Sequence, residues 1–432
     1  MDPIDRTHPV QCTGAPLPKG ETSKPASTSD FGTRVGKLAA TLALTGWALG
    51  VHAFEQPADG VYSDHIDWGV MMDLSGPASY AQVPWTEGLK SYLRKVNEAG
   101  GIHGRKINIL AEDDRFDVSL DRVNYEKLAN QTPVLGISGL GNSNAQVTLL
   151  PSIKRGKVPI VGTHVSTKAA IEPPTPMFYG GFCGFKEMAQ VGVGFFTDRM
   201  KLKAPRVATV HLDVASGKEY FGHVEAEAVK RGGSARSIPI KVTASDATPQ
   251  VLEIIAMKPD FVTVHGVATT AILLMRTLQQ YGLKIPAFAI TYMGTPVVYT
   301  ALGPEAGSEY YFVSCFTPGS VDEPGGVKEM STLADKHGHA ALKDDINYVA
   351  GWVVGQIVSE SIARIGPEPT REKLIASMEK GFEVDTKDVS SPVKYTKDNH
   401  LGLMLLRPYS YDYQTKKFKA YGKYSDYQKF VK

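Results

Sequence analysis

Short apolar segments alternate with amphipathic segments from residue 66 onward. Strands are predicted at the short apolar runs, which are 66–72, 106–114, 133–138 and 158–162. Helices are predicted where apolar residues recur at helical spacing, at 83–101, at 119–131 with Ser119 as its cap, and at 143–156. This strand–helix repeat predicts a parallel sheet with helices on both faces.

The same order restarts in the second half of the chain, after a predicted helix at 186–200. Further strands are predicted at 206–211, 234–239, 261–265 and 287–290. The helices between them are predicted at 217–231, 248–257 and 270–281. Because the halves match in order and length, we expect an α/β protein with two doubly wound, parallel-sheet lobes.

The last third of the chain departs from this repeat. A strand is predicted at 310–318, helices at 326–337, 346–365 and 370–380, and a strand-rich region at 392–418. The simplest arrangement places the helices that follow the second lobe back on the first lobe. The chain then passes between the two lobes three times, and we call these passages crossings. We therefore expect lobe 1 to comprise 64–181 with 317–395, and lobe 2 to comprise 182–316 with 396–432.

The first 53 residues have a different character. Residues 1–30 are rich in Pro, Ser, Thr and Lys and cannot supply a core. Arg34 and Lys37 then precede a 13-residue apolar run, 38–50, and small residues at the positions that a signal peptidase reads. We interpret 1–53 as a leader and secretory signal peptide cleaved after Ala53, with an N-terminal membrane anchor as the alternative.

The charge balance narrows the range of partners. The 432 residues include 47 Lys and Arg against 45 Asp and Glu, a net charge of +2. No basic cluster with interleaved aromatic residues is present, so neither nucleic acid nor an anionic membrane is expected as a partner. An exported chain meets an oxidising compartment, and two cysteines, Cys183 and Cys315, remain after the leader is removed.

The segment "GISGLGNSNA" (136–145) joins a predicted strand to a predicted helix. Gly139 and Gly141 permit close backbone approach, and Asn142 and Ser143 offer polar groups beside the free N–H groups of a helix start, a place that favours anions. The segment lacks the nucleophile elbow, the phosphate loop and the dinucleotide fingerprint. We therefore expect neither an enzyme nor a cofactor site, and a capped helix without ligand remains the alternative.

Two further loops follow first-lobe strands at the same edge. "LSGPASYAQ" (74–82) supplies Ser79 and Tyr80, and "GTHVSTKAA" (162–170) supplies Val165, Ser166 and Thr167. Convergence of three loops on one rim favours a bound small ligand.

The corresponding second-lobe loops are 212–222, 266–270 and 290–296. They carry few charges and several aromatic residues, which suits an apolar ligand body. The pair His337 and His339 has no Cys or carboxylate at metal-ligand spacing, so we expect it at the surface and predict no metal site.

The motifs "LSGPASYAQ", "EAGGIHGRKINILAEDD", "GISGLGNSNA", "VPIVGTHVSTKAA" and "INYVAGWVVGQIVSESIARIG" together resemble the periplasmic leucine/isoleucine/valine-binding proteins. These are the type I solute-binding components of ABC importers. The resemblance implies the type I periplasmic binding protein fold and a periplasmic monomer that passes a small ligand to an inner-membrane ABC permease. A sensory binding protein that reports its ligand to a receptor is the alternative.

The resemblance also assigns roles to residues. Asn142, Ser143, Val165 and Ser166 match groups that hold a carboxylate, Tyr80 matches an aromatic residue that packs on the ligand, and Phe221 matches a Tyr that closes from the second lobe. The match fails at Tyr292, because amino-acid binders of this family have at this position an acidic residue that contacts the α-ammonium of the ligand. Asp213, on the same rim, is an alternative acidic residue for this role. The ligand is therefore either a branched-chain or other hydrophobic amino acid, or an aromatic or aliphatic acid or amide.

In this fold the hinge strands lie side by side, with Cys183 at the first crossing and Cys315 at the second. The resemblance therefore predicts a disulfide across the hinge, with two separate buried cysteines as the alternative.

Overall fold

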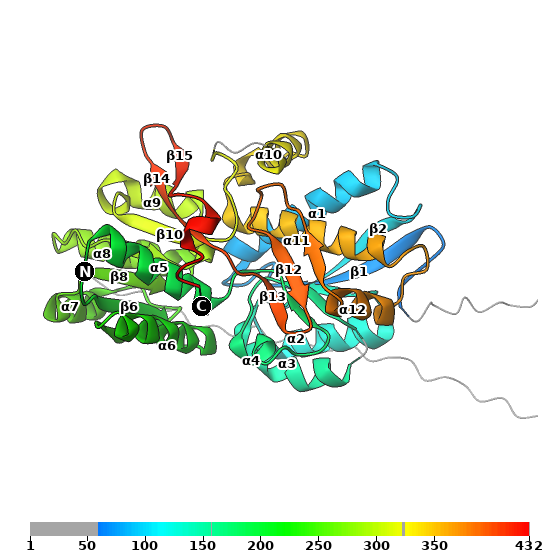
Figure 1. Ribbon diagram of the computed structural model, residues 1–432, viewed down its shortest axis with the longest axis horizontal. Coiled ribbons are helices and arrows are strands. Elements are labelled where there is room, and N and C mark those ends of the chain that lie inside the picture. The colour runs from blue at the N-terminus through cyan, green and yellow to red at the C-terminus, as the bar shows by residue number, and fades with distance from the viewer. Residues whose placement is uncertain (1–58, 157, 322–324, 432) are drawn as a thin grey trace, which may run out of the picture. The chain divides into compact units, whose positions relative to one another are not determined.

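The computed structural model describes residues 59–156, 158–321 and 325–431 (Figure 1). The predicted leader, signal peptide and cleavage after Ala53 lie outside the described residues. All elements below belong to one unit of the chain, Glu55–Lys432.

The first lobe contains a five-stranded parallel sheet of order β2-β1-β3-β4-β5. Its strands are β1 (His65–Met72), β2 (Lys106–Asp113), β3 (Ile137–Gly139), β4 (Ile160–Thr163) and β5 (Phe178–Gly180). Its helices are α1 (Ser79–Glu98), α2 (Val118–Glu126), α3 (Ser143–Arg155) and α4 (Lys168–Ile171). The inner strands are buried on both faces and are therefore apolar, whereas β2 forms the edge and is partly exposed.

The first two helices, α1 and α2, begin at residues other than those predicted, and hydrogen bonds from backbone N–H groups to a carboxylate explain both differences. Helix α1 begins at Ser79 rather than at 83, because the Asp73 carboxylate accepts the N–H groups of Gly76 and Ala78 and fixes the preceding turn. Ser119 is not the cap of α2. The cap is Asp117, whose carboxylate accepts the N–H of Ser119 at 2.7 Å.

The second lobe contains a seven-stranded sheet of order β15-β14-β10-β9-β8-β6-β7. Its strands are β6 (Arg206–Leu212), β7 (Ser234–Ile240), β8 (Phe261–His265), β9 (Ala287–Ala289), β10 (Tyr310–Ser314), β14 (Arg407–Asp412) and β15 (Lys417–Ala420). Its helices are α5 (Phe185–Arg199), α6 (Ala215–Lys230), α7 (Thr248–Met257), α8 (Ala268–Gln280) and α9 (Pro296–Gly307). Strands β6 to β10 are parallel, and β14 and β15 add an antiparallel edge.

The chain returns to the first lobe after β10. Helix α10 (Gly326–Lys336) leads to α11 (Ile346–Arg364), which packs along α1, and then to α12 (Arg371–Glu379) (Figure 1). Through α11 this part of the chain packs on first-lobe elements, namely α1 and β4.

The predicted boundary at which the chain passes for the last time from lobe 1 to lobe 2, between residues 395 and 396, falls inside strand β12. Strands β11 (Phe382–Val384), β12 (Val393–Thr396) and β13 (Asn399–Leu403) form a small antiparallel sheet beside β5. His400 Nδ1 lies 3.0 Å from the carbonyl oxygens of Thr175 and Phe178, and the Tyr395 hydroxyl donates to the carbonyl of Gly180. Because the β12–β13 pair cannot be divided, the chain passes to the second lobe only between β13 and β14.

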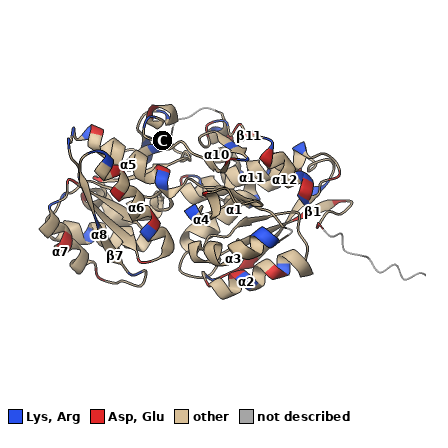
Figure 2. Ribbon diagram, turned by 60° about the horizontal axis from the view of Figure 1, so that its bottom comes forward, with Lys and Arg blue, Asp and Glu red and all other residues tan. Residues whose placement is uncertain are grey.

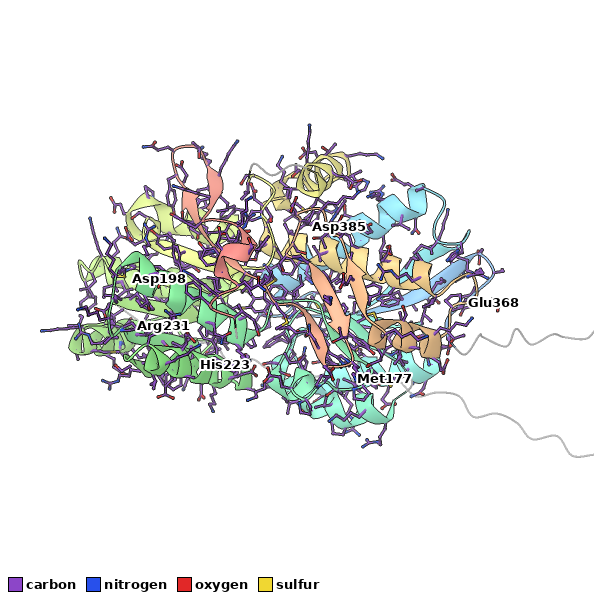
Figure 3. All side chains as sticks on the ribbon, viewed as in Figure 1. Met177, Asp198, His223, Arg231, Glu368 and Asp385 are labelled. Atoms are coloured by element: carbon purple, nitrogen blue, oxygen red, sulfur yellow. A yellow bond between two sulfur atoms is a disulfide. The ribbon has the colours of Figure 1, made fainter. Side chains whose placement is uncertain are left out.

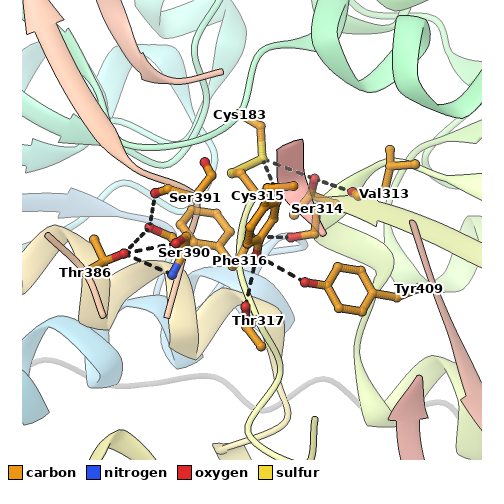
Figure 4. Close-up of a disulfide and its surroundings, with 12 residues drawn as sticks. Cys183, Val313, Ser314, Cys315, Phe316, Thr317, Thr386, Ser390, Ser391 and Tyr409 are labelled. Atoms are coloured by element: carbon orange, nitrogen blue, oxygen red, sulfur yellow. Dashed lines mark hydrogen bonds between the residues drawn. A yellow bond between two sulfur atoms is a disulfide. The ribbon is translucent and has the colours of Figure 1, made fainter. Parts of the chain in front are cut away.

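A disulfide joins Cys183, in the first crossing, to Cys315, which directly follows β10 (Figure 4). The two Cα atoms are 6.0 Å apart, and 132 residues separate the cysteines in the sequence. Both side chains are buried. The N–H of Ser391 donates to the carbonyl of Cys315 at 2.7 Å, which ties this crossing to the segment before β12. The disulfide predicted across the hinge is therefore present.

Acidic and basic residues are interspersed over the elements of both lobes (Figure 2). Among the described residues, no helix combines the length and the apolar character needed to cross a membrane.

Candidate functional site

A cavity of about 120 Å³ lies between the lobes, at the carboxyl ends of their parallel strands. Its first-lobe wall comes from the loops after β1, β3 and β4, and its second-lobe wall from the loops after β6, β8 and β9. The structure thus brings together all six loops that the sequence analysis placed on the two rims. Ligands of open α/β sheets bind at this edge.

Several predicted ligand-binding residues line the cavity. They are Tyr80, Gly141, Asn142, Ser143 and Val165 from the first lobe, and Tyr292 from the second.

Three other predicted residues do not line the cavity. The Ser79 hydroxyl donates to the carbonyl of Gly76 at 2.7 Å, within the first turn of α1. The hydroxyl of Ser166 lies 3.1 Å from that of Thr163, whereas the buried hydroxyl of Thr167 has no hydrogen-bond partner among the described residues. The hydroxyls of Ser79 and Ser166 are thus directed to partners within the first lobe.

The two remaining second-lobe candidates also lie away from the cavity. The ring of Phe221 stacks on His211 with centroids 5.9 Å apart. Asp213 is exposed and forms an ion pair with Lys218 at 2.9 Å, so it does not replace the acid that is missing at Tyr292.

The loop after β3 presents the start of α3 to the cavity. The Asn142 side chain caps this helix by accepting the N–H groups of Asn144 at 3.0 Å and Ala145 at 3.4 Å. The backbone N–H groups of Ser143 and Val165 donate to no acceptor among the described residues. Unpaired N–H groups at a helix start are favourable partners for an anion.

Gln146 fixes the spacing of these two loops. Its amide nitrogen donates to the carbonyls of Leu140 at 3.0 Å and Val165 at 2.6 Å, and its amide oxygen accepts the N–H of Thr167 at 3.2 Å. Because Gln146 is fully buried, the two loops are held at a fixed separation.

The lobes touch one another around the cavity. The Ser143 hydroxyl donates to that of Ser216 at 3.3 Å, and the N–H of Lys168 donates to the Glu219 carboxylate at 3.0 Å. Asn347 adds a third link, since it lies 3.3 Å from His164 Nε2 and donates to the carbonyl of Tyr292 at 3.4 Å. The structure therefore has the lobes closed over the cavity.

Two histidines of the cavity wall are uncharged at neutral pH. Burial lowers the pKa of His164 to about 4, although its bond to Asn347 partly opposes the shift. Burial, assisted by the nearby His211, lowers the pKa of His265 to about 3. Both imidazoles therefore act as neutral hydrogen-bonding groups.

Sequence reasoning missed part of the wall. Phe116, His164, Phe185 and His265 also line the cavity. His164 lies inside a loop that was identified, and His265 ends a strand that was predicted, so their positions along the chain were available. What the sequence could not supply was the direction of each side chain.

His337 was expected at the surface, and this expectation is wrong. Its side chain is only 2% exposed, and its Nδ1 lies 3.0 Å from the hydroxyl of Ser91 on α1. In the described ranges, no group of three or more His, Cys, Asp or Glu side chains is placed to hold a metal ion.

Glu219 links the lobes in an environment that disfavours its charge. Burial raises its pKa to about 7, and the negative charges of Glu172 and Glu187 add to the shift, whereas the N–H of Lys168 opposes it. His223, one turn away on α6, lies where this helix approaches α4 (Figure 3). The charged and titratable groups around this carboxyl are Lys168, Glu172, Lys186, Glu187 and His223.

We expect Glu219→Gln to reduce the loss of stability between pH 5 and pH 8. A carboxyl whose pKa is raised on folding contributes stability that is complete below its ordinary pKa of 4.5 and is lost as the pH rises through about 7. The difference should be on the order of 2 kcal/mol, because one pKa unit corresponds to about 1.4 kcal/mol. Urea unfolding at both pH values measures it.

The matched control is Glu225→Gln, at an exposed position on the same helix, which should follow the parent pH profile. If Glu219→Gln had the same dependence of stability on pH as the parent, the Glu219 carboxyl would ionise in the folded protein without a loss of stability.

The fold and the cavity together define a two-lobed ligand-binding protein. A family model described as periplasmic binding protein matches residues 66–413, and the chain belongs to this family. This membership confirms the resemblance to periplasmic binding proteins that the sequence motifs indicated. No curated protein matches the chain at a significant level.

Solved structures of similar fold include proteins with different stated ligands. A fatty acid ABC transporter substrate-binding protein from Thermomonospora curvata superposes with a TM-score of 0.75 at 20% identity, over 84% of this chain and 92% of that chain. A branched chain amino acid ABC transporter from Thermus thermophilus, with bound valine, gives 0.74 at 18% identity, over 83% and 95%. A substrate-binding periplasmic protein from Ralstonia solanacearum gives 0.73 at 17% identity, over 82% and 100%. At these identities the comparisons support the shared fold.

Proposed function

We propose that this protein captures a small carboxylate-bearing ligand in the cavity between its lobes and delivers it to an ABC permease in the inner membrane. The observation that carries the proposal is the pair of unpaired N–H groups, at Ser143 and Val165, beside an otherwise apolar cavity. Periplasmic binding proteins are substrate-binding proteins rather than enzymes, and the cavity requires no catalytic step.

The first step is docking of the anionic end on the first lobe. Two N–H groups and the positive end of the α3 dipole stabilise a carboxylate without a cationic side chain. Gln146 holds both donors in place before the ligand arrives, so little ordering is needed on binding. The Ser143 hydroxyl lies on the same rim, but its proton is donated to Ser216 in the closed form.

The second step is closure of the second lobe. Contacts at Ser216, Glu219 and Tyr292 join the lobes beside the cavity, so a ligand that fills it adds contacts to both lobes and favours the closed form. The closed form would present both lobes to a permease. Neighbours of the same fold whose names refer to fatty acid or valine support a carboxylate ligand, since both molecules carry one.

The proposal places the mature protein in the periplasm, after removal of the signal peptide near Ala53. Membership of the periplasmic binding protein family supports this location. We propose that the protein acts there as a monomer, and the net charge of the full sequence is close to zero, at +2.

We expect a thermal-shift screen of hydrophobic amino acids, aryl and aliphatic acids and their amides to yield a stabilising ligand. A ligand at 100 times its Kd adds about 2.7 kcal/mol to the free energy of unfolding. Val214→Trp should abolish the shift, because Val214 lines the cavity and is only half-buried, so a larger ring can fill the space.

The matched control is Val229→Trp in α6, the helix that Val214 precedes, at a position 60% exposed and outside the cavity. It should retain the ligand shift. A panel in which nothing stabilises the protein, or a shift that survives Val214→Trp, would overturn the proposed site.

A further inference from the structure

We infer that the ligand of this cavity is an acid without an ammonium group: a carboxylate joined to an apolar body that carries no amine. The inference rests on the function proposed above and narrows its ligand class. It follows from the charges around the cavity rather than from its shape.

No Asp, Glu, Lys or Arg among the described residues lines the cavity. Two carboxyl groups, Asp345 and Glu219, act electrostatically on the wall residues Tyr80 and Tyr292, but both accept hydrogen bonds from other groups. Asp345 caps α11 by accepting the N–H of Asn347 at 2.9 Å and its side-chain amide at 3.0 Å. Glu219 accepts the N–H of Lys168.

The cavity would therefore stabilise the carboxylate of an amino acid but not its ammonium group. A carboxylate finds the N–H groups of Ser143 and Val165, which stabilise an anion without a counter-charge. A desolvated ammonium would find only neutral acceptors, and a buried charge without a charged partner is costly. The protein thus stabilises one sign of charge and not the other.

The remainder of the wall also suits an uncharged ligand body. Phe116, Phe185 and Leu212 line the cavity, and the Tyr292 ring stacks on Phe182 with centroids 4.3 Å apart and planes 10° from parallel. The Tyr292 hydroxyl and His265 Nδ1 are buried without a partner among the described residues. These neutral groups can bond to a hydroxyl or carbonyl, but they cannot neutralise an ammonium.

Three matched pairs test the inference by calorimetry on the mature protein. They are 4-methylpentanoate with leucine, 3-phenylpropanoate with phenylalanine, and 3-(4-hydroxyphenyl)propanoate with tyrosine. In each pair that binds, we expect the amine-free acid to bind more tightly by about 100-fold or more, which is roughly 2.7 kcal/mol. An amino acid that binds as tightly as its amine-free partner overturns the inference and leaves the proposed function standing. If no member of any pair binds, both are overturned.

A charge-introducing variant gives an independent readout. Val267 is half-buried, lines the second-lobe wall and occupies the N-cap of α8, where Asp and Asn are both favourable. Val267→Asp should reduce the acid-to-amino-acid preference by at least tenfold relative to Val267→Asn, which has the same shape without the charge. Equal preferences in the two variants would overturn the inference, because they would show that charge in the cavity does not control selection.

Discussion

Removal of the Cys183–Cys315 disulfide is expected to lower the free energy of unfolding by up to about 5 kcal/mol at 25 °C. The bond closes a loop that spans 132 residues, and cross-linking so long a segment restricts the unfolded chain strongly. It also joins two crossings between the lobes, so its loss frees the hinge as well as the unfolded state. Urea unfolding of the Cys183→Ala, Cys315→Ala double variant against the parent measures the difference.

The double variant should also be insensitive to reductant, whereas the parent should become less stable when it is unfolded and refolded with dithiothreitol. Both sulfur atoms are buried, so brief exposure of the folded parent to reductant should have little effect. Equal urea midpoints for the parent and the double variant would show that the bond is absent in solution or does not constrain the unfolded chain.

The order of strands and helices could be predicted because buried parallel strands are apolar over most of their length, and the helices between them carry an apolar face. The elements that were missed lack these signals. Strands β5 and β11 have only three residues each. Helix α9 is interrupted at Gly303, which has φ 65° and precedes Pro304, so no continuous helical pattern exists there.

The sequence predicted where the site lies better than it predicted which side chains line it. Parallel strands bring their following loops to one edge whatever the loops contain, which is why all six predicted loops meet at the cavity. Which side chains face the ligand depends on the loop backbone. In the loop after β4, His164 and Val165 line the cavity while the hydroxyl of Ser166 is directed to Thr163.

The long-range contacts that hold the site together could not be predicted from the sequence either. Gln146 is a polar residue in a helix, and nothing in its local pattern shows that it joins two loops. Asn347 lies 183 residues from His164 in the chain, yet it connects that histidine to the second lobe. Such contacts arise from packing of distant elements and have no local signature.

Gly351→Ala is expected to destabilise the protein by about 4 kcal/mol or more, because overpacking at a close backbone contact leaves no room for relaxation. Helices α1 and α11 approach so closely that a Cβ at Gly351 would lie 1.8 Å from the carbonyl oxygen of Trp85. The contact is reciprocal, since a Cβ at Gly88 would lie 2.0 Å from the carbonyl oxygen of Tyr348. The free energy of unfolding in urea measures the loss.

The matched control is Gly222→Ala in α6, where a Cβ would meet nothing within 4 Å. This change should stabilise the protein by about 0.5–1 kcal/mol through its effect on helix propensity and the unfolded chain. Helix α1 carries Tyr80 and α11 carries Asn347, so separation of the two helices should also weaken ligand binding in any Gly351→Ala protein that folds. A Gly351→Ala variant as stable as the parent would mean that the helices do not cross in backbone contact, and the packing that positions Tyr80 and Asn347 at the cavity would have to be different.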